Sequence, residues 1–204
     1  MKKLLFFTVL LLLVYTQVFS FMLMTNNSKV ESGGAACDTA EYTNTTGDPD
    51  ANLDIKDIAG TTMVGGDYTT TGAIDVCAVT FYISRKDADI TANTYHVEIW
   101  TESGGNLGTQ QGSDSNGIQG DNSWGTTGPT AEALKFEFAS SVSLSATTTY
   151  WFLVTHNQSP NSATECELWY YQPGSNNRAS VDGDTTGSAI ADTAGGPKMI
   201  IWTD

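Results

Sequence analysis

The chain has 204 residues and a formal net charge of −14, with nine Lys and Arg residues against 23 Asp and Glu residues. A chain this acidic lacks the basic surface that nucleic acid requires and is repelled by anionic membranes, so we expect neither as a partner. Its length is sufficient for one sizeable hydrophobic core, which favours a single domain.

The first 20 residues have the pattern of an export signal. Two lysines precede an apolar run over residues 4–15, and the small residue Ser20 follows Val18 by two positions. We expect cleavage after Ser20 and a secreted or cell-surface protein. The alternative is an uncleaved anchor, because the apolar stretch over residues 4–24 is just long enough to span a bilayer. Cleavage would remove both lysines and move the net charge from −14 to −16.

Residues 21–50 are rich in small polar residues, which predicts a flexible polar lead-in. Residues 51–204 are expected to form one all-β domain, an antiparallel β-sandwich of jelly-roll type. Apolar residues alternate with polar ones there, and none of these segments shows helical spacing. Two polar stretches, 101–130 and 172–197, predict long loops.

Seven segments show this alternation most clearly. It places Cys77, Val79 and Phe81 on one inward face, and it places Tyr95 and Val97 on another. In chain order the expected strands are DVCAVTFYIS (75–84), TYHVEIW (94–100), ALKFEFA (133–139), SVSLS (141–145), TYWFLVTH (149–156), ECELWYYQ (165–172) and KMIIWT (198–203).

The segment Tyr150–Val154 is apolar at every position, so both of its faces need cover. This predicts a central strand, with Tyr150 and Phe152 in the core between the sheets. Trp151 and Leu153 would then lie on the other side of the sheet, and we expect Trp151 to be covered rather than to stack against a ligand.

Three cysteines, Cys37, Cys77 and Cys166, leave one thiol over if a disulfide forms. Export permits such a bond. A Cys77–Cys166 bond across the sheets is possible. We slightly favour Cys37–Cys77, because pinning a loose segment requires less exact geometry.

Several motifs after Asp67 follow an order seen in a known family. They are VEIW (97–100), ESGGNLGT (102–109), NSWGTT (122–127), LKFEFASSVSLSATTTYWFLV (134–154) and DGD (182–184). This order resembles the secreted bacterial β-sandwich modules called choice-of-anchor domains, type R in particular. The resemblance implies a jelly-roll-like sandwich on an exported protein, and it brings no catalytic residues.

Catalytic signals are weak in this sequence. No Gly-x-Ser-x-Gly motif is present, and we interpret His96 and His156 as surface residues. Three glutamates, Glu98, Glu137 and Glu167, have outward parity. They would permit a glycoside hydrolase only if two of them converged in one cleft.

Sugar binding without cleavage requires flat aromatic side chains and polar neighbours. Aromatic residues at outward or loop positions are therefore the candidate ligand-binding residues. They are Trp100, Trp124, Trp169 and Tyr171.

A calcium ion is the only cofactor that the residues suggest. Five oxygen-bearing side chains lie within ten residues in GDPDANLDIKD, and alternating oxygen ligands can surround a hard cation. The candidate ligands are Asp48, Asp50, Asn52, Asp54 and Asp57, with Asp182 and Asp184 as a weaker second group.

These observations favour an exported, non-enzymatic β-sandwich module with a recognition or structural role outside the cell. Its expected partner is an extracellular glycan or protein surface. A carbohydrate-binding module is the alternative, and a glycoside hydrolase is less favoured.

Overall fold

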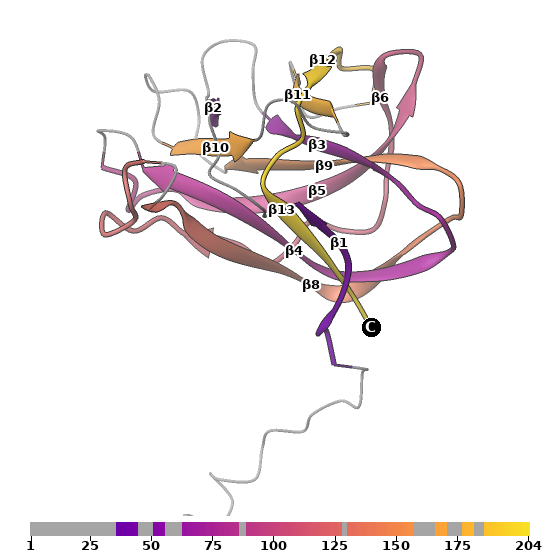
Figure 1. The fold of residues 1–204 in the computed structure, drawn as a ribbon, viewed down its shortest axis with the longest axis horizontal. Coiled ribbons are helices and arrows are strands. Elements are labelled where there is room, and N and C mark those ends of the chain that lie inside the picture. Colours follow the sequence, from indigo (N-terminus) through magenta and orange to yellow (C-terminus); the bar gives the residue numbers. More distant parts are fainter. Residues whose placement is uncertain are drawn as a thin grey trace, which may run out of the picture. The chain divides into compact units, whose positions relative to one another are not determined.

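The computed structural model describes residues 36–44, 51–55, 63–85, 89–127, 130–156, 166–170, 177–181 and 186–204. All of them belong to one compact unit, Ala36–Asp204. Two packed antiparallel β-sheets form this unit, as the sequence predicts (Figure 1). Within the described ranges, no helix has the length and apolar character needed to cross a membrane.

The first sheet is built around the long strand β4. β13 and then β10 pair with β4, and β8 pairs with it over Ile74–Ile83 on the opposite edge. β1 extends the sheet beyond β13, and β2 extends it beyond β10. The bounds are β1 Thr39–Asn44, β2 Ala51–Ile55, β4 Ile74–Arg85, β8 Glu132–Leu144, β10 Cys166–Tyr170 and β13 Met199–Thr203.

The second sheet has the order β12-β11-β3-β9-β5-β6, and the short β7 also pairs with β5. β9 therefore lies between β3 and β5, which confirms the predicted central strand. The bounds are β3 Met63–Thr69, β5 Thr94–Ser103, β6 Asn106–Gln110, β7 Ile118–Gln119, β9 Thr149–His156, β11 Asn177–Val181 and β12 Ile190–Ala194.

The two ends of the second sheet meet. The amide of Leu107 in β6 donates to the carbonyl of Ser188 (2.8 Å), and the amide of Ile190 in β12 donates to the carbonyl of Gly105 (3.0 Å). Figure 1 shows β6, β11 and β12 gathered at the same end of the sandwich. The sheet thus curls back on itself, and these backbone groups are satisfied internally instead of forming an open edge.

The main core fills the space between the sheets. Val79 and Phe81 of β4 and Phe136 of β8 lie on one side, and the alternate residues of β5 and β9 lie on the other. The inward positions expected for β5 and β9 are confirmed, and they are all at most 3% exposed: Tyr95, Val97, Ile99, Tyr150, Phe152 and Val154.

A second apolar cluster lies on the other face of the second sheet. Trp100, Trp151 and Leu153 contribute to it from β5 and β9, and Leu107 and Val181 contribute from the strands that curl over them. Trp151 is 2% exposed, so the prediction that it is covered is confirmed.

Close approach between β3 and β9 depends on Gly65. A Cβ atom at this position would lie 1.8 Å from the carbonyl oxygen of Phe152. A side chain cannot occupy that space, so only glycine permits the two strands to pair at this distance.

Within the lead-in predicted at 21–50, a loose structure is wrong for Thr39–Asn44, because these residues form β1 and pair with β13. β1 also contacts the second sheet, because the Tyr68 hydroxyl of β3 donates a hydrogen bond to Glu41 of β1 at 2.9 Å. Burial of the Tyr68 side chain is the main reason that its pKa is raised to about 12, and the hydrogen bond to Glu41 adds to this effect.

The predicted signal peptide lies outside the described residues.

The two predicted loops contain strands. β6 and β7 fall within 101–130, and β11 and β12 fall within 172–197. These strands are short and have few apolar residues, so periodicity does not reveal them. The separately predicted strands at 133–139 and 141–145 form the single strand β8.

The inward position predicted for Cys77 is wrong. The pairing of β4 with both β8 and β13 shifts register between Val76 and Ala78, so Cys77 has no paired residue on either side. Such a bulge changes which face the following residues occupy. Val76 and Val79 consequently share the main core, and Cys77 bonds to Cys37.

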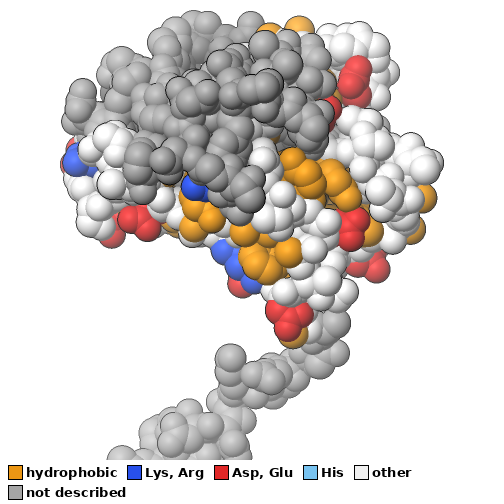
Figure 2. Space-filling view, viewed as in Figure 1, with side chains coloured by type: hydrophobic (Ala, Val, Ile, Leu, Met, Phe, Trp, Pro, Cys, Tyr) orange, Lys and Arg blue, Asp and Glu red, His pale blue; other side chains and the backbone are white. Residues whose placement is uncertain are grey.

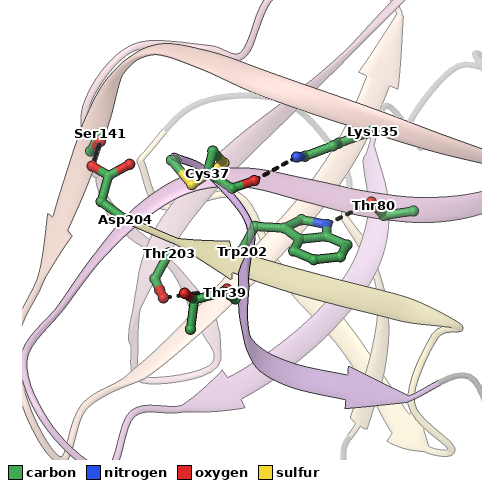
Figure 3. The surroundings of a disulfide bond; sticks show 9 residues. Cys37, Thr39, Thr80, Lys135, Ser141, Trp202, Thr203 and Asp204 are labelled. Carbon is green, nitrogen blue, oxygen red and sulfur yellow. Dashed lines mark hydrogen bonds between the residues drawn. A yellow bond between two sulfur atoms is a disulfide. The ribbon is translucent and has the colours of Figure 1, made fainter. Parts of the chain in front are cut away.

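The Cys37–Cys77 pairing is the one that we favoured from the sequence, and it links residues 40 positions apart. Lys135 of β8 donates to the carbonyl oxygen of Cys37 at 2.7 Å (Figure 3). The disulfide therefore fastens the chain just before β1 to the middle of the first sheet.

We expect the double substitution Cys37→Ser and Cys77→Ser to lower the free energy of unfolding by about 4 kcal/mol, because an open loop of this length gains entropy when the chain unfolds. Urea denaturation measures the change. A reductant should destabilise the parent and leave the double variant unaffected. Equal effects of reductant on both proteins would contradict a stabilising role for this bond.

Candidate functional site

Polar groups converge on the face of β5 that points away from the main core. His96, Glu98 and Trp100 alternate with the core residues of β5 and share this face. Trp100 belongs to the second apolar cluster, Glu98 is 7% exposed and His96 is half-buried. A carboxylate this deeply buried requires polar partners.

The third member of the group is Asp114, an exposed residue on segment 111–117 between β6 and β7. The His96 Nε2 atom is 3.4 Å from Glu98 Oε1 and 3.6 Å from Asp114 Oδ2. One ligand atom from each of the three residues lies within 4.8 Å of the other two.

In each of the two carboxylates, the oxygen that does not face His96 accepts a hydrogen bond from a neutral donor. The Trp100 indole Nε1 donates to Glu98 Oε2 at 2.7 Å, and the Gln110 amide Nε2 donates to Asp114 Oδ1 at 2.6 Å. Each carboxylate therefore has one anchored oxygen and one oxygen directed at His96. Such anchoring fixes the orientation of a charged group before it meets a cation.

Backbone contacts position the segment that carries Asp114. Ser115 makes two hydrogen bonds with Val97 of β5. The Ser115 hydroxyl accepts from the Val97 amide at 2.8 Å, and the Ser115 amide donates to the Val97 carbonyl at 3.0 Å. The Gln111 amide also donates to the carbonyl of Ile99 at 2.7 Å. Asp114 is thus held against β5 on both sides of its position in the chain.

The electrostatics of the group favour positive charge. The pKa of His96 is raised, mainly by its interaction with the Glu98 carboxylate and further by the charge of Asp114, while partial burial acts in the opposite direction. Two carboxylate oxygens and one imidazole nitrogen around a common centre can hold either a proton on the imidazole or a metal cation.

Two of the predicted sugar-binding residues are not accessible, so this prediction is wrong for them. Trp100 is 4% exposed in the second apolar cluster, and Trp124 is 7% exposed and packs against the Tyr95 ring at 5.7 Å. Because both rings are used in packing, neither can stack on a sugar. The Trp169 side chain and all of Tyr171 lie outside the described residues.

Most of the predicted calcium group also lies outside the described residues. This holds for Asp48, Asp50, Asp57 and the 182–184 segment. The backbone of Asn52 and Asp54 belongs to β2, where these residues pair with Trp169 and Glu167 of β10. Calcium binding there remains a prediction.

The carboxylates considered for glycan cleavage do not all converge. Glu98 lies on β5 of the second sheet, whereas Glu137 lies on the exposed face of β8 in the first sheet. Glu98 and Glu137 therefore do not share a cleft, because the packed core lies between their faces. The backbone of Glu167 is part of β10 in the first sheet, and its side chain is not among the described parts of the structure.

The group of His96, Glu98 and Asp114 is not among the sites that the sequence predicts. Alternation along β5 does place His96 and Glu98 on one face, so the sequence is sufficient to predict that these two residues are neighbours. Asp114 carries no such signal, because its proximity to β5 depends on how segment 111–117 folds back onto that strand.

The comparisons with known proteins returned no match to this chain among family models, curated proteins or solved structures. The resemblance to choice-of-anchor domains therefore remains an expectation from the sequence motifs.

Trp100 and Trp151 lie opposite each other on neighbouring strands and provide a matched pair of substitutions. The Trp100 indole N–H binds Glu98, whereas the Trp151 indole N–H is buried with no hydrogen-bond partner in the described structure. We expect Trp100→Phe to cost about 1–3 kcal/mol more than Trp151→Phe, because it leaves a buried carboxylate oxygen without its donor.

The free energies of unfolding from urea denaturation test this difference, since both variants lose similar packing. Equal losses would show that the Trp100–Glu98 hydrogen bond contributes nothing to stability.

Proposed function

We propose that the protein is an exported, non-enzymatic β-sandwich module that acts outside the cell in recognition or as part of an extracellular assembly. The observation that carries this proposal is the Cys37–Cys77 disulfide. Disulfides form and persist in oxidising compartments. The export signal predicted in the first 20 residues is consistent with such a compartment.

A surface for recognition is supported by the outer face of the first sheet. This face is defined here by Thr80, Tyr82, Lys135 and Trp202, together with Lys198, which precedes β13 and lies over the Tyr82 ring. The Trp202 indole donates to the Thr80 hydroxyl at 2.8 Å, which fixes the ring on this face (Figure 3). Both aromatic residues of this face, Tyr82 and Trp202, are only partly buried.

Lysines lie over both aromatic rings of the outer face. The Nζ atom of Lys135 is 4.8 Å from the centroid of the Trp202 ring, and that of Lys198 is 4.2 Å from the centroid of the Tyr82 ring. In the region of β1, β13 and β4, Figure 2 shows hydrophobic side chains beside basic ones. Aromatic and cationic groups together are suited to binding a glycan or a protein surface.

Export is tested by producing the full chain in a bacterial host and analysing the cell fractions. We expect the mature protein outside the cytoplasm, with a mass that corresponds to cleavage after Ser20. Peptide mapping without reduction should recover Cys37 linked to Cys77. Full-length protein retained in the cytoplasm with reduced cysteines would contradict export.

Recognition is tested on a panel of soluble polysaccharides and extracellular proteins, with affinity electrophoresis and immobilised-ligand binding as the measurements. For a ligand that binds, we expect Trp202→Ala and Tyr82→Ala each to weaken binding by more than about tenfold, because aromatic residues dominate contact energies. Thr69→Ala, an exposed substitution on the second sheet, is the control and should not change binding. Release of reducing sugar from any polysaccharide would contradict the non-enzymatic role.

A further inference from the structure

We propose that His96, Glu98 and Asp114 bind a divalent transition-metal ion of the zinc type. This site is separate from the outer face of the first sheet, because its residues belong to β5 and the segment after β6 in the second sheet. The inference is therefore independent of the proposed recognition function.

Two of the three distances between ligand atoms fit a tetrahedral ion, and the third, between the two carboxylates, is within 4.8 Å. Two ligands bound to zinc at about 2.1 Å and separated by the tetrahedral angle lie about 3.4 Å apart. His96 Nε2 is 3.4 Å from Glu98 Oε1 and 3.6 Å from Asp114 Oδ2. A direct ion pair between imidazolium and carboxylate usually closes to about 2.7–2.9 Å, so these distances leave room for an ion.

The surroundings of the three ligands are those of a built site. Glu98 is only 7% exposed, and its other oxygen is held by the Trp100 indole. Gln110 holds the other oxygen of Asp114 in the same way. Metal sites commonly use such outer partners to orient their ligands, and the anchored carboxylates leave one free oxygen each for the ion.

Charge also favours a dication at this position. Glu98 and Asp114 bring two negative charges together in a chain whose net charge is −14. A dication bound with neutral imidazole balances both carboxylates, and this reduces the cost of burying Glu98. An imidazole ligand favours a transition metal over calcium or magnesium, which prefer oxygen ligands.

The site has an accessible side, because Asp114 is exposed while Glu98 is buried. An ion could enter there and keep a water molecule as its fourth ligand. Since Asp114 lies on segment 111–117 and the other ligands lie on β5, the bound ion would fasten that segment to the second sheet. This link would add to the contacts that Ser115 already makes with β5.

Cobalt(II) titration of the metal-free full chain tests the site, because tetrahedral cobalt with nitrogen and oxygen ligands absorbs visible light strongly. We expect one equivalent to bind with a tetrahedral spectrum and to be displaced by zinc. His96→Gln and Asp114→Asn should each weaken binding by more than about 100-fold, and Gln110→Ala, which removes only the anchoring donor, by about tenfold.

Matched controls come from the same chain. His156→Gln replaces the other histidine, and Glu132→Gln replaces an exposed carboxylate on β8, so both should retain the cobalt spectrum and the affinity. Circular dichroism of the metal-free variants confirms that each one is folded. Asp114→Asn is the key variant, because its exposed side chain can change without disturbing the core.

Thermal melting gives a second readout. Zinc should raise the melting temperature of the parent and not that of Asp114→Asn, whereas magnesium at matched ionic strength should raise neither. The proposal is overturned if cobalt does not bind, if binding survives both His96→Gln and Asp114→Asn, or if zinc stabilises Asp114→Asn as much as the parent.

Discussion

The need to cover both faces of β9 organises this structure. Tyr150, Phe152 and Val154 face the core between the sheets, so the alternate residues Trp151 and Leu153 require cover on the opposite side of the same strand. The second sheet provides that cover by curling until β6 and the start of β12 share hydrogen bonds. The curl creates the second apolar cluster and also removes an open sheet edge.

The buried environment of Glu98 follows from the same curl. β5 neighbours β9 and presents His96, Glu98 and Trp100 on the covered side of the sheet. Trp100 lies in the apolar cluster and donates to Glu98, which connects the packing of the sheet to the polar group beside it. A polar group at the border of an apolar cluster has less contact with water, so its charge interactions are stronger than those of an exposed carboxylate.

The disulfide depends on a local departure from strand regularity. Cys77 is the extra residue of β4 opposite β13, and the pairing of β4 with β8 also shifts register there, so Cys77 is released from the main core. On the outer face it reaches Cys37, whose carbonyl also binds Lys135. Lys135 in turn lies over the Trp202 ring, so the fastening of β1 and the surface proposed for recognition share one side chain.

By itself, the sequence determined the fold class, the central position of Tyr150–Val154 and the inward residues of β5 and β9. Alternation with period two is a local property, and it identifies strands wherever one or both faces carry enough apolar residues. The preference for Cys37–Cys77 was also correct, although the inward orientation assumed for Cys77 was wrong.

Only the tertiary structure decided the bulge at Cys77, the strands within the two polar stretches and the burial of Trp100 and Trp124. These features depend on which segments become neighbours. The group of His96, Glu98 and Asp114 is the clearest case. Alternation places its first two members on one face of β5, but Asp114 joins them only because Ser115 bonds to Val97 and holds the segment against that strand. A contact between residues far apart in sequence has no periodic signal, so folding of the whole chain determines it.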